Sequence, residues 1–146
     1  MTLRREFEIV VPGEPRGVGR PRFGRGRDGS PRVYVAIADR EYADRIALAW
    51  KDAGCPYLPS GPWSCELSAH MERPKAHRRT SGELSAKGLQ FPYPTRKPDA
   101  DNILKVVDAL VRVSAVPDDS ALVEARVVKT WAEPGEARLV IRVEAA

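Results

Sequence analysis

Short acidic side chains gather in one part of this 146-residue sequence. Five acids lie between residues 99 and 119, and all are aspartates: Asp99, Asp101, Asp108, Asp118 and Asp119. A solvated helical face would usually include glutamate, which is the better helix former. Hard cations such as Mg²⁺ prefer carboxylate oxygens, with water and a substrate phosphate completing the coordination shell. Because strongly basic segments accompany these acids, the pattern predicts a metal site that acts on a polyanion.

The first of these acids belong to a predicted amphipathic helix over residues 100–113. Pro98 disfavours helical geometry in the residue before it, so the helix begins just after the proline. At about 100° per residue, Asp101 lies about 40° from Lys105 and about 20° from Asp108. These three side chains therefore project from one face, while the apolar residues of the helix point into a core.

Each acid also has an ordinary structural interpretation. Asp99 could cap the helix, and Asp101 could be a first-turn acid that the helix dipole favours. Asp101 and Lys105 could form an exposed ion pair, and Asp118-Asp119 could be a surface turn. Together these interpretations leave the combination unexplained: an Asp-x-Asp pair, a lysine one turn later, and a second acidic pair after a short connection.

Two basic segments accompany the acids. The loop predicted over residues 12–32 is rich in Gly and Pro, and residues 73–98 carry seven basic side chains and one acidic one. Arginine binds phosphate with both arms of its fork, and a flexible loop can follow a branched duplex. A disordered solubilising tail is the alternative for the first segment, but its position between predicted strands argues against it. We expect DNA contacts from Arg16, Arg20, Arg22, Arg25, Arg27, Arg32, Arg96 and Lys97.

The remaining elements follow from periodicity and from turn residues. Alternating patterns predict strands over residues 4–11, 33–37, 63–71, 122–131 and 137–143. A helix is predicted over residues 40–53, with Asp39 as its N-cap. Pro134-Gly135 predicts a turn that pairs the last two strands as a hairpin. Residues 73–98 receive no assigned structure. We expect one small α+β domain over residues 1–146, with a mixed sheet flanked by two helices.

Composition excludes several classes of protein. Hydrophobic residues make up 42% of the sequence and charged residues 30%, which is ordinary for a globular protein and argues against a disordered or fibrous chain. No apolar run is long enough to span a membrane, and residues 1–11 lack the features of a signal peptide. The two cysteines are not in CxxC spacing, so we expect reduced thiols and a cytoplasmic location.

Several motifs together resemble the RusA family of Holliday-junction resolvases. The acidic block reads KPDADNILK at 97–105, DAL at 108–110 and DDS at 118–120. The opening is similar too, with PGEP at 12–15 and GRPRF at 19–23. Lys129, ten residues after Asp119, also matches a family lysine. The resemblance is weak only between about residues 54 and 90.

The resemblance implies an endodeoxyribonuclease that hydrolyses DNA phosphodiesters at four-way junctions. It implies a Mg²⁺ site, which Mn²⁺ could also fill, formed by Asp99, Asp101 and Asp119. Lys105 would contact the scissile phosphate or assist the attacking water, and Asp118 would lie just outside the metal's ligands. Secondary roles would fall to Asn102, Asp108 and Lys129. Paired symmetric nicks imply a homodimer, in a bacterial or phage-encoded protein.

One spacing departs from the family pattern. Only Val106 and Val107 separate Lys105 from Asp108, where family members usually have three residues, so Asp108 is not counted among the implied metal ligands. Two other functions stay open on the sequence alone. One is a junction-binding module without activity, in which the acids serve as caps and ion pairs. The other is a metal nuclease that acts on different branched nucleic acids, such as flaps or RNA.

Overall fold

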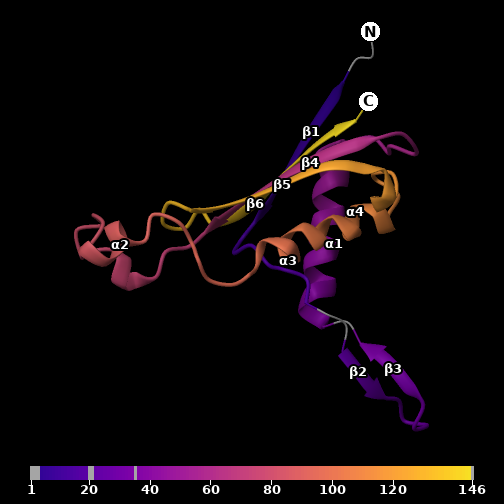
Figure 1. Ribbon diagram of the computed structural model, residues 1–146, viewed down its shortest axis with the longest axis horizontal. Coiled ribbons are helices and arrows are strands. Elements are labelled where there is room, and N and C mark those ends of the chain that lie inside the picture. The colour runs from indigo at the N-terminus through magenta and orange to yellow at the C-terminus, as the bar shows by residue number, and fades with distance from the viewer. Residues whose placement is uncertain (1–3, 20–21, 35, 146) are drawn as a thin grey trace.

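A mixed sheet of four strands forms the body of the protein. The computed structural model describes residues 4–19, 22–34 and 36–145. The strands are β1 (Arg5–Pro12), β4 (Trp63–Met71), β5 (Leu122–Trp131) and β6 (Arg138–Ala145), in the order β1-β6-β4-β5. β6 pairs antiparallel with β1 and β4, whereas β4 and β5 are parallel. This arrangement confirms the expected α+β fold with a mixed sheet (Figure 1).

Helices cover one face of this sheet. α1 (Ile37–Asp52) packs near β1, and α3 (Ala100–Leu104) lies against β4 and β5. A 3₁₀ turn continues α3 into α4 (Asp108–Arg112), so the predicted helix over 100–113 is present with tighter winding at its centre. Figure 1 shows α1 and the α3–α4 pair on the same side of the sheet.

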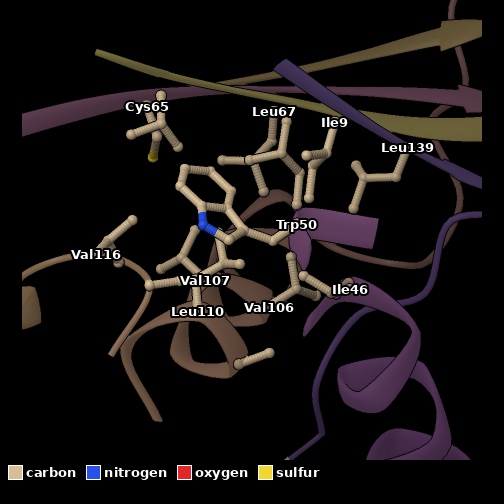
Figure 2. Packing of buried hydrophobic residues seen from close by; sticks show 14 of the residues in the cluster. Ile9, Ile46, Trp50, Cys65, Leu67, Val106, Val107, Leu110, Val116 and Leu139 are labelled. Atoms are coloured by element: carbon tan, nitrogen blue, oxygen red, sulfur yellow. The ribbon is translucent and has the colours of Figure 1, made fainter. Parts of the chain in front are cut away.

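The core lies between the sheet and these helices. Leu67 on β4 and Ile9 on β1 are buried, and both lie on the face toward α1 and α3. Figure 2 shows Trp50 of α1 among these sheet residues and the helix residues Val106 and Leu110. The strict alternation of burial along β4 matches its apolar-polar sequence, as expected for a strand with one face in a core. The core therefore fixes which face of α3–α4 is left for solvent.

The predicted pairing of the last two strands is wrong. β4 lies between β5 and β6, so these strands are not hydrogen-bonded to each other. Pro134-Gly135 does reverse the chain, but the connection passes the end of β4, where Ala132 N–H bonds the carbonyl of Met71 at 2.8 Å. A turn motif specifies a reversal of direction. It does not specify whether another strand lies between the two that it connects, and here β4 does.

The region between β1 and α1 also differs from its prediction. Part of the predicted loop over 12–32 is β2 (Arg22–Arg25), which pairs antiparallel with β3 (Pro31–Tyr34). β3 ends before the predicted strand over 33–37 would, because Ile37 already begins α1. Asp39 lies inside the first turn and is not the N-cap, a position that Ala36 occupies. The carboxylate of Asp39 instead binds Arg16.

The basic Pro-rich segment folds around one tryptophan. It contains a 3₁₀ turn (Lys75–His77) and α2 (Ala86–Gln90). The guanidinium groups of Arg73 and Arg96 lie 5.2 and 5.8 Å from the centre of the Trp131 ring. His77 is buried against the same ring, with the ring centres 5.4 Å apart.

Within the described residues, no helix is long and apolar enough to cross a membrane.

Candidate active site

The polar face of α3–α4 carries the predicted chemistry. Asp101, Lys105 and Asp108 are exposed, while Ile103 and Val106 between them are buried. This pattern confirms that the three charged residues share one face of the helix. The helix has this orientation because its apolar residues pack against the sheet. This packing leaves a charged stripe, formed by Asp101, Lys105 and Asp108, exposed to solvent.

Two of the ordinary interpretations of these acids do not hold in the structure. Asp99 occupies the N-cap position of α3, but its side chain makes no capping hydrogen bond. Asp101 forms no salt bridge among the described residues, because Lys105 donates a hydrogen bond to Oδ1 of Asn102 at 3.2 Å instead. The carboxylates of Asp99 and Asp101 are therefore not committed to holding the helix and can bind another group.

A small pocket lies beside this stripe, between the helix and α1. It is lined by Lys105 and Asp108 from one side and by Arg16, Asp39 and Tyr42 from the other. Arg16 Nε donates to Asp39 Oδ1 at 2.8 Å. The Tyr42 hydroxyl is buried without a hydrogen-bond partner in the described part of the chain, and burial raises its pKa. A buried hydroxyl is ordinarily paired, so the pocket offers a polar group to a bound water or ligand.

Sequence reasoning missed two members of this pocket. Asp39 was expected to cap a helix, and Tyr42 was given no functional role. Arg16 and Asp39 are 23 positions apart, so no local pattern could reveal their ion pair. The segment containing Arg16 reaches the helix because Val18 N–H bonds the carbonyl of Asn102 at 2.9 Å. A Cβ on Gly17 would come within 2.8 Å of Pro98, so only glycine permits this close approach.

The second acidic pair stands at the start of β5. Trp63 Nε1 donates to the backbone carbonyl of Asp118 at 3.0 Å, which ties the pair to the start of β4. A shared hydrogen bond with Asp118, and the negative charges of Asp118 and Asp108, raise the pKa of Asp119 above its usual value. The same hydrogen bond lowers the pKa of Asp118. Uncompensated negative charge of this kind would attract a cation.

The two acidic pairs lie at opposite ends of β5. Lys129, near the carboxyl end of the strand, donates to the carbonyl of Arg96, three residues before Asp99. Asp118 and Asp119 precede Leu122, at the other end of the strand, and seven residues of strand span about 23 Å. Figure 1 shows α4 toward the end where the chain enters β5, with α3 toward the other.

The residues therefore fit a hard cation in type but not in arrangement within one chain. Exposed aspartates are suitable ligands for Mg²⁺. However, no three Asp, Glu, His or Cys side chains in the described parts of the chain lie close enough together to hold a metal ion. In the described residues, Asp99, Asp101 and Asp119 therefore do not form a cluster of this kind.

The predicted DNA-contacting arginines fall into two groups. Arg25, Arg27 and Arg32 are exposed on the β2–β3 hairpin, which projects away from the sheet (Figure 1). Arg16 and Arg96 are also exposed, but each forms an ion pair, with Asp39 and with Glu14, respectively. Lys97 is exposed beside α3. Arg20 lies outside the described residues, and Arg22 belongs to β2 without a described side chain.

The hairpin is an ordered element with its own internal contacts. Its tip turns through residues 26–30, where Ser30 N–H and Oγ donate to Asp28 Oδ1 at 3.0 and 2.6 Å. These bonds lower the pKa of Asp28. The Tyr34 ring lies over Gly24, where a Cβ would come within 2.6 Å of the ring. Phe23 stands out from the hairpin with 85% of its surface exposed.

Comparison with known proteins shows the family of this chain. The chain is 29% identical over 138 residues to an uncharacterized protein, YqaN, of Bacillus subtilis (strain 168), covering 93% of this chain and 95% of that protein. A family model described as endodeoxyribonuclease RusA matches residues 12–144, which includes the hairpin and both acidic pairs. With a match over nearly its whole length, the chain belongs to the RusA endodeoxyribonuclease family.

Proposed function

We propose that this protein is a divalent-metal-dependent endodeoxyribonuclease that resolves four-way DNA junctions by paired symmetric nicks. The family match is the observation that carries the proposal. The uncommitted carboxylates of Asp99 and Asp101 support it, as does the exposed Lys105 on the same helix face. Because an enzyme that cuts two strands symmetrically needs two equivalent sites, the acting form is a homodimer.

Each part of the protein has a role in this proposal. Asp99, Asp101 and Asp119 would provide the carboxylates for Mg²⁺, or for Mn²⁺ in its place, and Asp118 would lie just outside the metal's ligands. The ion would activate water and stabilise charge on the phosphate during hydrolysis. Lys105, oriented by Asn102, binds the scissile phosphate. Lys129 fixes the segment that leads into α3 by bonding Arg96.

The basic elements would bind the branched duplex. The hairpin presents Arg25, Arg27 and Arg32 at a distance from the charged stripe of α3–α4. It can therefore reach a DNA arm beside the one being cut. Among the described residues, no side chain is arranged as a recognisable reader of base edges. Recognition would therefore depend on the shape of the junction and on phosphate contacts.

The decisive experiment is cleavage of a labelled synthetic four-way junction beside a linear duplex built from the same arms. With Mg²⁺ we expect symmetric nicks in the junction, none in the duplex, and none anywhere after addition of EDTA. Tight junction binding without cuts under Mg²⁺ or Mn²⁺ would instead identify a binding module. Preferential cleavage of flaps or RNA would identify a metal nuclease with another substrate.

A further inference from the structure

We infer that the strap, residues 13–18 between β1 and the β2–β3 hairpin, positions Lys105 for DNA cleavage, and that the Arg16–Asp39 ion pair holds the strap in place. The role of Lys105 in this inference rests on the proposed function, whereas the contacts of the strap do not. Arg16 and Asp39 are positioning residues here, because they act on the reaction through Asn102 and Lys105.

The strap is bonded at both ends to elements that are distant in the sequence. At its start, Glu14 Oε2 accepts a hydrogen bond from the backbone N–H of Glu72, just after β4, at 3.0 Å. At its end, Val18 N–H donates to the backbone carbonyl of Asn102 on α3 at 2.9 Å. These two bonds fix the course of the strap between the end of β4 and the helix that carries the charged stripe.

The strap lies directly against the residue that orients Lys105. A Cβ on Gly17 would come within 2.8 Å of Pro98 Cβ and 2.9 Å of Asn102 Cβ. Asn102 therefore contacts the strap through its backbone and Cβ, and it accepts a hydrogen bond from Lys105 Nζ through its side chain. A lysine ammonium is carried on a flexible stem, so it needs such a partner to stay in one place. Movement of the strap would release that partner.

The Arg16–Asp39 ion pair fastens the strap to a second helix. Arg16 Nε lies 2.8 Å from Asp39 Oδ1, and the Asp39 side chain is only 10% exposed. A partly buried pair is screened less by salt than a fully exposed one. Asp39 lies in the first turn of α1, whose residues Tyr42 and Ile46 are buried in the core. The pair therefore joins the strap to a helix that is itself fixed.

A pocket behind the strap makes these polar contacts necessary. The pocket has a volume of about 50 Å³ and is lined by Arg16, Gly17 and Val18 of the strap and by Tyr42 and Lys105 opposite them. Protein interiors are ordinarily close-packed, so a void removes contacts that would otherwise hold its walls. Packing alone does not fix this part of the strap. Its hydrogen bonds and its ion pair do.

The same ion pair joins the two segments from which the hairpin leaves the body of the protein. Residues 16 and 39 flank β2 and β3 in the sequence, and Figure 1 shows the hairpin beyond the N-terminal end of α1. Under the proposed function, the hairpin binds one part of the DNA and Lys105 binds the phosphate to be cut. A misplacement of about 1 Å between such groups can lower a rate about 100-fold, so a fixed strap would matter for cleavage.

The ion pair is tested by two variants of opposite charge. Arg16→Ala removes a positive charge and Asp39→Ala a negative one, so an effect that they share cannot come from net charge. With saturating protein in excess over a labelled four-way junction, we expect both to lower the cleavage rate about tenfold or more, because Lys105 is misplaced. Asp44→Ala removes an exposed acid from the same helix and should cleave at the wild-type rate.

A direct DNA contact by Arg16 predicts a different result. Arg16→Ala would then weaken junction binding and leave the rate at saturation unchanged, whereas Asp39→Ala would free the guanidinium and strengthen binding. Gel shifts in EDTA measure binding apart from cleavage, and thermal unfolding checks that each variant is folded at the assay temperature. Opposite effects on binding, with normal rates at saturation, would overturn the positioning role.

A matched pair of glycine variants tests the strap without any change of charge. Gly17→Ala would force a Cβ against Pro98 and Asn102, whereas a Cβ on Gly19 meets only Asp39, at an ordinary 3.8 Å. We expect Gly17→Ala to displace the strap and to lower the rate at saturation about tenfold, and Gly19→Ala to leave it unchanged. Equal rates for these two variants would overturn the role of the close contact.

The route through Asn102 is tested by combining variants. If the strap acts through this residue, Asp39→Ala should slow cleavage by less than about threefold in a protein that already carries Asn102→Ala. Independent effects multiply, as they would if Asp39→Ala only loosened the fold. A double variant whose loss equals the product of the two single losses would therefore overturn the route.

Hydrogen exchange reports on the strap without any measurement of cleavage. Because Val18 N–H is bonded to Asn102, we expect this amide to exchange slowly in the wild type. Asp39→Ala and Gly17→Ala should speed its exchange about tenfold or more, and Gly19→Ala should not. Unchanged protection in the first two variants would show that the ion pair and the close contact do not hold the strap.

These readouts separate failure of the inference from failure of the proposed function. A wild type that shows the expected exchange pattern but does not cleave junctions would retain the strap and refute the nuclease. An active wild type whose Arg16→Ala and Asp39→Ala variants cleave normally would retain the nuclease and refute the positioning role.

Discussion

At the scale of single residues, the proposed function depends on carboxylates that hold no other described group of the protein. Asp99 is at a helix N-cap without capping it, and Asp101 stands one turn before a lysine without pairing with it. A side chain that contributes little to folding yet occupies a fixed place on a rigid helix is suited to bind a ligand. The motif spacing predicted this face correctly, because helical periodicity alone determines which residues share a side.

Replacement of Asp101 separates catalysis from binding. We expect Asp101→Asn to lower junction cleavage on the order of 100-fold or more, since a carboxylate that would hold the metal ion is lost. Junction binding should persist or tighten, because a negative charge near the phosphates is removed. Gel-shift and cleavage assays on the same preparation measure both. Asp52→Asn, an exposed change at the far end of α1, is the matched control and should leave both unchanged. Full cleavage by Asp101→Asn would refute the site assignment.

The two cysteines should differ in reactivity. Burial on β4 raises the pKa of the Cys65 thiol to about 11, so almost none of it is thiolate near neutral pH. Cys55 is partly exposed in the loop after α1, although burial raises its pKa too. At about pH 8, iodoacetamide should therefore modify Cys55 and leave Cys65 intact until the protein is unfolded. Mass spectrometry of peptides from native and denatured samples measures this. Equal labelling in the native state would contradict the burial of β4.

At the scale of elements, a segment that was predicted as a loop contains an ordered arm, the β2–β3 hairpin. Residues 12–32 contain many Gly and Pro residues and little that could be buried, which predicted irregular structure. The β2–β3 hairpin forms nonetheless, because close packing of Tyr34 over Gly24 and the bonds of Asp28 at the tip depend on particular pairs across the turn. Composition cannot reveal such pairs. The arm therefore brings Arg25, Arg27 and Arg32 together on one element that projects from the sheet.

Loss of two arginines from this arm should weaken DNA binding through phosphate contacts. We expect Arg25→Ala with Arg32→Ala to reduce junction affinity and to lower the slope of log K against log salt by roughly two. Titrations at several salt concentrations measure the slope. The control removes two positive charges elsewhere, with Arg4→Ala and Lys51→Ala, and should retain the wild-type slope. If both double variants behave alike, the arm acts only through net charge and does not contact DNA.

At the scale of the whole molecule, the order of the strands decides which strand lies at the edge of the sheet. Because β4 lies between β5 and β6, β5 becomes an edge strand among the described elements. A hairpin of β5 and β6 would have given β5 a partner on the side that is now open. The same topology thus explains why one edge of β5 has no partner among the described elements.

Dimers with unequal copies should uncouple the two nicks. A tagged heterodimer of wild type and Asp101→Asn retains one intact site. We expect it to convert a supercoiled cruciform plasmid to nicked circles, whereas the wild-type dimer makes linear molecules by cutting both strands within one encounter. Agarose gels distinguish the two products. Linear product from the heterodimer at the wild-type rate would show that one site can make both cuts.

The amino-acid sequence by itself determined what depends on neighbours along the chain. The spacing of Asp101, Lys105 and Asp108 fixed one helix face, and the alternation in β4 fixed a strand with one buried face. The turn at Pro134-Gly135 is also specified by neighbouring residues, but the order of the strands in the sheet is not. That choice, the Arg16–Asp39 pair and the separation of Asp101 from Asp119 were decided by the packing of apolar faces from distant segments, which no local pattern encodes.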